Sequence, residues 1–144
     1  MAKPRTRSFL RGFIAGLITK FLTAVLLIAG SVIFDRIWAA VNDTLFTPLI
    51  GPPVLGTSLW WTVQALGFLA AIAAGIAAAH WSPRGSWAAS IALILLMLVL
   101  GLMGIPQTES ILYILLCVLS APVGIFIGAA LYRRREAVAQ VSNV

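Results

Sequence analysis

Four long apolar segments follow one another along the chain. They run from about 13 to 34, 59 to 79, 87 to 103 and 111 to 131, and polar or Gly- and Pro-containing stretches separate them. Each segment is close to the ~20 residues that a helix needs to cross ~30 Å of hydrocarbon. The pattern predicts an all-α membrane protein in which residues 1–144 form a single domain with four transmembrane helices.

The connections between these segments carry residues that end helices. Prolines stand in all three, at Pro48, Pro52 and Pro53, then at Pro83, then at Pro106. Proline lacks the backbone N–H that continues a helix, and its ring clashes with the preceding turn. The second and third connections are short, so we expect the second, third and fourth segments to be antiparallel neighbours.

The first connection has an amphipathic pattern of its own. In the stretch DRIWAAVNDTLFTPLI, residues 35–50, Ile37, Val41 and Leu45 recur every four residues. Asp35 and Asp43 fall toward the other face. This spacing predicts a short helix lying on the outer membrane surface. A docking element for an extracytoplasmic partner is the alternative.

Composition supports the membrane assignment. The chain is 61% hydrophobic and 10% charged, with a mean hydropathy of +1.04. A soluble domain of this size cannot hide so much apolar surface. A single cysteine, Cys117, rules out an internal disulfide and a metal site built from cysteines of one chain.

The positive charges predict the orientation. Eight of the ten Lys and Arg residues fall on one side of a four-span arrangement: Lys3, Arg5, Arg7, Arg11, Arg84, Arg133, Arg134 and Arg135. Only Arg36 falls on the other side. Because such residues stay cytoplasmic in short loops, we predict that both termini are cytoplasmic. The net charge of +6 then meets the anionic surface of the lipid bilayer, and we expect no nucleic-acid partner.

The first segment has a second interpretation. A basic start followed by FLTAVLLIAGS also fits a cleaved secretory signal. The apolar residues before Lys20 make this segment long for a signal, so a transmembrane helix is favoured. With either interpretation, we expect a multi-pass protein in the inner (plasma) membrane of a bacterium.

Small residues form lines along two of the predicted helices. Gly67, Ala71, Gly75 and Ala79 recur every four residues in the second segment, and Ser120, Gly124 and Gly128 do so in the fourth. Small side chains let helix backbones approach closely within lipid. We expect these lines to pack within the bundle. A face for a homo-oligomer or a membrane-protein partner is the alternative.

Two polar residues lie inside predicted spans. Lys20 costs ~2.5–3.5 kcal/mol at a helix centre, which the apolar residues of its segment outweigh. We expect its side chain to snorkel toward the cytoplasmic headgroups, although charges within a membrane are also functional candidates. Gln64 is placed to hydrogen-bond across helices, with a structural role favoured over transport.

The remaining chemistry is sparse. His80 stands beside Trp81 at the predicted end of the second helix, which favours the interfacial aromatic belt over a metal or proton-linked role. No span contains Asp or Glu, and no nucleophile–base pair or phosphate-binding loop is present. We therefore expect no catalytic residues, no cofactor and no metal, and we predict that the protein is not an enzyme.

The second half of the chain resembles a known type of protein. The run GIAAAHWSPRGSWAASIALILLMLVLGLMGIPQTESILYILLCVLSAPVGIFIGAALYRRR resembles a loose class of small four-span bacterial inner-membrane proteins of unassigned function. The shared features are a small-residue helix ending in Pro-Arg, a leucine-rich third helix, a Pro-containing outer turn, and Ala-Pro and Gly before a basic end. The resemblance implies the topology and supplies no active site.

These observations favour one function and leave another open. We expect a small non-enzymatic integral membrane protein that acts through helix packing with itself or with a partner complex. The alternative is an oligomeric channel, transporter or holin-like permeabilising protein. Its pore lining would have to come from seven residues: Thr19, Lys20, Thr23, Ser31, Thr62, Gln64 and Ser120.

Overall fold

The computed structural model describes residues 7–41, 58–84, 86–103 and 111–141, apart from some side chains near the helix ends. These residues form four α-helices: α1 (Phe9–Val41), α2 (Ser58–Trp81), α3 (Ala88–Met103) and α4 (Ile111–Val141). The predicted all-α class is confirmed over this part of the chain.

Three helices are long and apolar enough to cross a membrane. Their candidate spans within the described residues are Phe9–Gly30, Thr62–Trp81 and Ile114–Gln140. Helix α3 has 16 residues, or ~24 Å at 1.5 Å per residue, and is shorter than the ~30 Å hydrocarbon layer. The structure therefore supports a membrane protein with several apolar helices.

Two helices extend beyond the predicted segments. Residues 35–41, which we predicted to begin a separate surface helix, instead continue α1, and residues 42–50 lie outside the described residues. Helix α4 continues past 131 to Val141. Hydropathy marks the apolar part of a helix, whereas Ala, Arg, Glu and Gln extend a helix readily in water.

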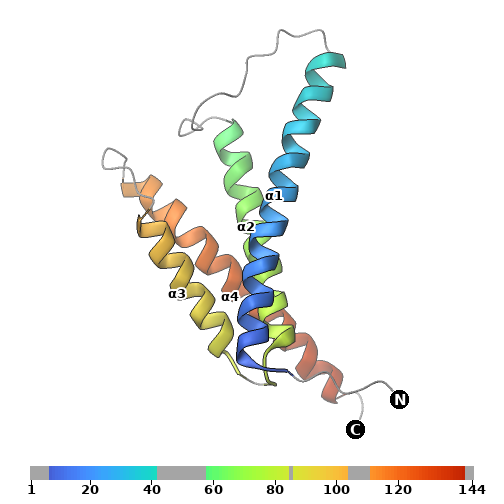
Figure 1. Ribbon diagram of the computed structural model, residues 1–144, viewed down its shortest axis with the longest axis vertical. Coiled ribbons are helices and arrows are strands. Elements are labelled where there is room, and N and C mark those ends of the chain that lie inside the picture. The colour runs from blue at the N-terminus through green and yellow to red at the C-terminus, as the bar shows by residue number, and fades with distance from the viewer. Residues whose placement is uncertain (1–6, 42–57, 85, 104–110, 142–144) are drawn as a thin grey trace.

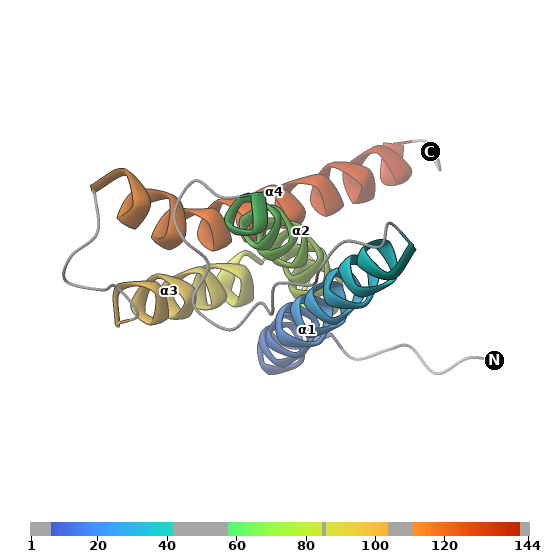
Figure 2. The ribbon, with the colours of Figure 1, turned by 90° about the horizontal axis from the view of Figure 1, so that it is seen from above.

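Helix α2 makes the most extensive packing contacts of the four helices. Helix α2 packs against both α1 and α4, while α3 packs mainly against α4. Seen from above, α2 lies between α1 and α4, which do not contact each other within the described residues (Figure 2). Toward the top of Figure 1, α1 leans to the right and α3 and α4 lean to the left, with α2 between them, so the helices are closest in their lower halves.

The core lies in this lower half and is built from small side chains. Ala71, Ala74 and Ala78 of α2 are fully buried, together with Leu93 of α3 and Ile125 of α4. Alanine brings the backbones close, and the larger Leu93 and Ile125 fill the space between helices. Packing therefore comes from close backbone approach around two large side chains.

Candidate functional site

The closest approach in the molecule is the crossing of α2 and α4. A Cβ atom added at Gly75 would overlap the carbonyl oxygen of Ile125, and one added at Gly128 would overlap the carbonyl oxygen of Ile72. Both obstacles are backbone atoms, which cannot rotate away as a flexible side chain can. Glycine is therefore required sterically on both helices, as expected where small residues let membrane helices approach.

The same contact continues one turn along α4. A Cβ at Gly124 would lie 2.7 Å from the Cβ of Ala71 and 3.0 Å from the carbonyl oxygen of Phe68. Ala71 and Gly124 thus face each other, while Gly75 and Gly128 each face the backbone of the opposite helix.

A second glycine contact joins α1 to α2. A Cβ at Gly12 would lie 2.8 Å from the carbonyl oxygen of Ala78, and one at Gly16 would lie 2.9 Å from the Cβ of Ala78. The backbone N–H of Ser8 also donates to the carbonyl of Trp81 at 3.1 Å, and Ser8 caps α1 through the N–H of Arg11. The start of α1 is thereby fastened to the end of α2.

Gly67 lies outside these contacts. A Cβ added there would meet no atom within 4 Å. Its carbonyl oxygen instead accepts a hydrogen bond from the Nζ of Lys20 at 2.6 Å. Of the glycines in the predicted line, Gly75 is the one at the tight crossing, and Gly67 contributes a backbone acceptor.

The position of Lys20 differs from the snorkelling that we expected. Gly16 lies against Ala74 and Ala78, and Gly67 lies about two turns before Ala74 on α2. Lys20 therefore reaches away from the arginine-rich end. An ammonium group is costly in hydrocarbon, and a nearby carbonyl acceptor offsets part of that cost. The hydrogen bond to Gly67 therefore competes with solvation of the Lys20 ammonium group by distant headgroups. Gln64, which is half-buried, lies one turn before Gly67 on α2.

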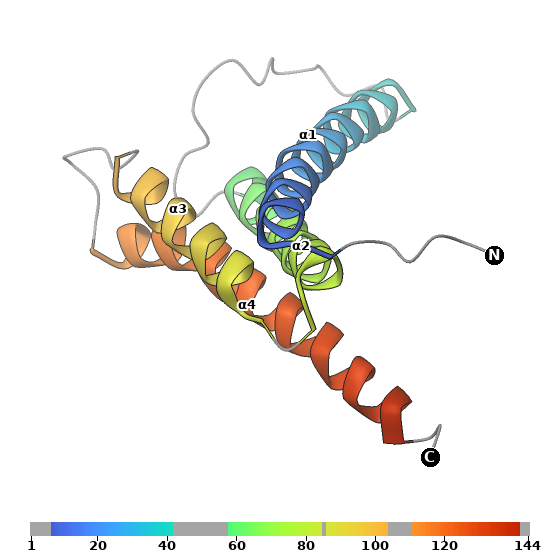
Figure 3. The same cartoon turned by 60° about the horizontal axis from the view of Figure 1, so that its bottom comes forward.

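The opposite end of the helices carries a cluster of polar and aromatic side chains. Arg7 pairs with Glu136 at 2.6 Å, and the Nε of Arg84 lies 3.9 Å from the same carboxylate oxygen. The hydrogen bond to Glu136 raises the pKa of Arg7. The pair links the segment before α1 to the last turns of α4, which project past the other helices (Figure 3).

Arg133 joins α4 to the start of α3. Its Nη2 donates to the carbonyl of Ser86, and its guanidinium lies 4.6 Å from the ring centroid of Trp87. Trp87 in turn stacks on Phe126 with ring centroids 5.7 Å apart. The cation–π contact and the ring stacking together hold Trp87 against α4.

His80 has a direct partner on α4. Its Nδ1 lies 2.7 Å from the hydroxyl oxygen of Tyr132, and the two rings meet edge to face at 5.4 Å. The ring of Trp81 also meets the imidazole edge to face, with ring centroids 5.5 Å apart. His80 therefore takes part in α2–α4 packing, a role that its proximity to Trp81 in the sequence did not reveal.

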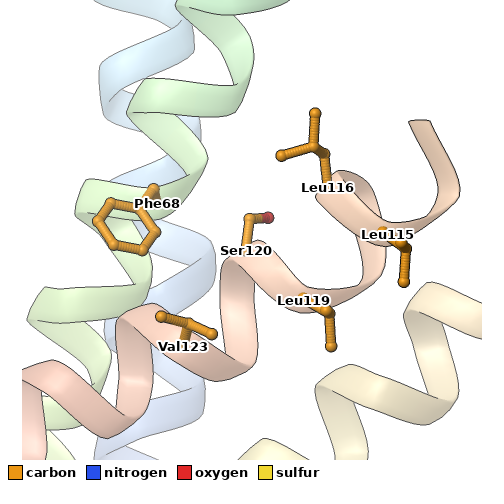
Figure 4. A pocket seen from close by; sticks show the side chains of 6 residues that line it. All are labelled: Phe68, Leu115, Leu116, Leu119, Ser120 and Val123. Atoms are coloured by element: carbon orange, nitrogen blue, oxygen red, sulfur yellow. The ribbon is translucent and has the colours of Figure 1, made fainter. Parts of the chain in front are cut away.

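An apolar pocket of about 340 Å³ opens between the diverging parts of α2 and α4. It is lined by Phe68, Leu115, Leu116, Leu119, Ser120 and Val123 (Figure 4). Phe68 comes from α2 and the other side chains from α4 (Figure 4), and Phe68 also lies against Gly124 at the glycine crossing. Its wall offers one hydroxyl and no ionisable group, so it suits apolar side chains or lipid chains.

The described residues contain no group of three His, Cys, Asp or Glu side chains placed to hold a metal ion. Comparisons with protein-family models, with curated proteins and with solved structures found no match to this chain. The functional argument therefore rests on the geometry of the glycine crossing, the apolar pocket and the arginine-rich end.

Proposed function

We propose that this protein is a non-enzymatic integral membrane protein that acts by packing against a transmembrane helix of a partner protein or of a second copy. The observation that carries the proposal is the apolar pocket beside Phe68 and Leu119. It lies next to the crossing at which the backbones of α2 and α4 meet, so the crossing fixes Phe68 relative to the α4 side chains of the pocket. Its volume of about 340 Å³ matches a few apolar side chains of one docked helix.

The proposal includes a four-span topology in a bacterial inner membrane, with both termini in the cytoplasm. Two observations support this placement. The basic residues Arg7, Arg84 and Arg133 gather at one end of the bundle around Glu136, as the positive-inside rule favours. Helix α3 packs alongside the long apolar helix α4 (Figure 3), which supports a fourth span at α3 even though this helix is short.

The pocket favours helix packing over a channel. A water-filled path needs a continuous polar lining, and Ser120 is the one polar residue among the six that line this pocket. Lys20, the charged candidate for a pore, already donates to a backbone carbonyl within the α1–α2 pair. Both features suit a protein that binds a partner helix through a complementary apolar surface.

Site-specific photo-crosslinking in native membranes tests the proposal. A photoreactive phenylalanine analogue in place of Leu119 should give a discrete cross-linked product of reproducible mass. The same analogue in place of Ile91 is the control, since Ile91 is 50% exposed, on α3, and outside the pocket. No protein product at Leu119, or equal products at both positions, would contradict the proposal. Ion conductance by the purified protein in liposomes would support the channel instead.

A further inference from the structure

A second pocket lies at the arginine-rich end and has a different chemistry. Its volume is about 640 Å³, and seven residues line it: Arg84, Trp87, Arg133, Arg134, Glu136, Ala137 and Gln140. The first two come from the connection between α2 and α3, and the others from the last turns of α4. Helix packing at the apolar pocket makes no use of these side chains.

The charge in this pocket is predominantly positive. Three guanidinium groups face one carboxylate, that of Glu136, which is already paired with Arg7 at 2.6 Å. Arg84 lies 3.9 Å from that carboxylate, beyond hydrogen-bond distance, and its side chain is 74% exposed. Its donors are therefore available to a ligand.

Arg133 is held in place while retaining donor capacity. Trp87 and the carbonyl of Ser86 fix its guanidinium, but its buried Nε–H has no acceptor within the described residues. A buried donor without an acceptor is costly, so the wall of this pocket contains an unsatisfied guanidinium donor. A guanidinium fork matches the oxygens of a phosphate group.

Apolar surface continues from the pocket toward the middle of the bundle. Trp87 stacks on Phe126, whose side chain is 55% exposed on α4, about two turns before Arg133. A ligand that fits both regions has an anionic head and an apolar tail. A free phosphate ion would use the arginines and leave the aromatic surface bare.

We propose that this pocket binds the anionic phosphodiester headgroup of a membrane phospholipid, with Arg84, Arg133 and Arg134 around the phosphate and an acyl chain along Phe126. The inference rests on the proposed membrane placement and is independent of any helix partner. Basic pockets between transmembrane helices on the cytoplasmic side are suited to such headgroups.

Native mass spectrometry of the full-length protein in detergent tests this site, with phosphatidylglycerol as the probe and phosphatidylcholine as the neutral comparison. The wild type should retain phosphatidylglycerol selectively. The double variant Arg84→Gln/Arg134→Gln should lower the apparent affinity about tenfold or more. The matched control Arg11→Gln/Arg135→Gln removes the same charge from exposed positions outside the pocket and should stay within about twofold.

Thermal melting of each variant reports folding, and Arg84→Gln alone carries the test if the double variant does not fold. If both double variants lose the same affinity for phosphatidylglycerol, the lipid is attracted to diffuse surface charge, and the proposed site is overturned. Undiminished binding by the pocket variant, or equal retention of both lipids, would do the same. Displacement of phosphatidylglycerol by millimolar inorganic phosphate would assign the pocket to a free anion. Failure here leaves the cross-link at Leu119 unaffected, so the two proposals are tested separately.

Discussion

Gly75 and Gly67 are both glycines on α2, yet their surroundings differ. The backbone of α4 touches Gly75, whereas an added Cβ at Gly67 would have no atom of another helix within 4 Å. Their spacing of eight residues gives both the same place in a four-residue pattern. The difference arises because α2 and α4 diverge above the crossing, so only the lower part of the line of small residues meets another helix.

This contrast predicts that adding one methyl group at Gly75 and at Gly67 changes the stability of the protein differently. Gly75→Ala should destabilise the protein by about 1–3 kcal/mol, because the new Cβ overlaps the carbonyl of Ile125. Gly67→Ala adds the same atom to the same helix without a clash and should melt at or above the wild-type temperature. Thermal unfolding in detergent measures both. Equal melting temperatures for the two variants would show that α2 and α4 do not cross at Gly75.

Lys20 leads to a second prediction at this scale. Lys20→Leu removes a charge that costs ~2.5–3.5 kcal/mol at mid-membrane, and it loses a hydrogen bond worth ~0.6–1.7 kcal/mol in measured membrane helices. The variant should therefore insert and fold at least as well as the parent. Membrane-fraction yield and melting temperature check this. A clearly lower melting temperature would make the bond to Gly67 a main support of the α1–α2 pair. Normal folding with lost function would make Lys20 a site residue.

Helices α1 and α4 make no helix-to-helix contact in the described residues, yet an ion pair connects their ends. Arg7 precedes α1 and Glu136 lies in the last turns of α4, with both side chains about one-quarter exposed. A double-mutant cycle with Arg7→Gln and Glu136→Gln should give a coupling of about 0.2–1 kcal/mol that weakens with salt. Thermal melts of the four proteins measure it. Additive effects of the two substitutions would mean that the ends of α1 and α4 are not joined.

The helices themselves were largely predictable, because lipid imposes a strong constraint on length and hydropathy. Segments 59–79, 87–103 and 111–131 correspond closely to α2, α3 and the apolar part of α4. The ends of α1 and α4 were not predictable from hydropathy, since residues such as Arg135, Glu136 and Ala137 continue a helix after the apolar stretch has finished.

The candidate site was predictable only in part. Spacing identified Gly75, Gly124 and Gly128 as packing residues, but periodicity along one helix does not reveal which helix faces it. Glu136 was missed because a single acid after three arginines reads as a minor change in a basic run. The available signal was its spacing of four residues from Tyr132, which places both on one face of the helix. Arg7 is 129 residues away in the chain, and only the fold brings it near.

Over the whole molecule, the two ends of the bundle differ in chemistry. At one end, arginines, Glu136 and the His80–Tyr132 pair connect the helices, and Arg84, Arg133 and Arg134 line a positively charged pocket. Away from that end the helices separate around an apolar pocket. This difference between the two ends suits a protein whose arginine-rich end contacts cytoplasmic headgroups while its apolar pocket is available within the bilayer.

The topology of α3 decides this whole-molecule description. A short α3 that crosses the membrane returns the arginine-rich end of α4 to the cytoplasm, whereas an α3 that does not cross leaves that end outside. Dual reporter fusions after Val141 and after Asn42 measure the difference directly. We predict a cytoplasmic signal after Val141 and an external signal after Asn42. An external signal after Val141 would contradict the four-span arrangement and, with it, the placement of both pockets.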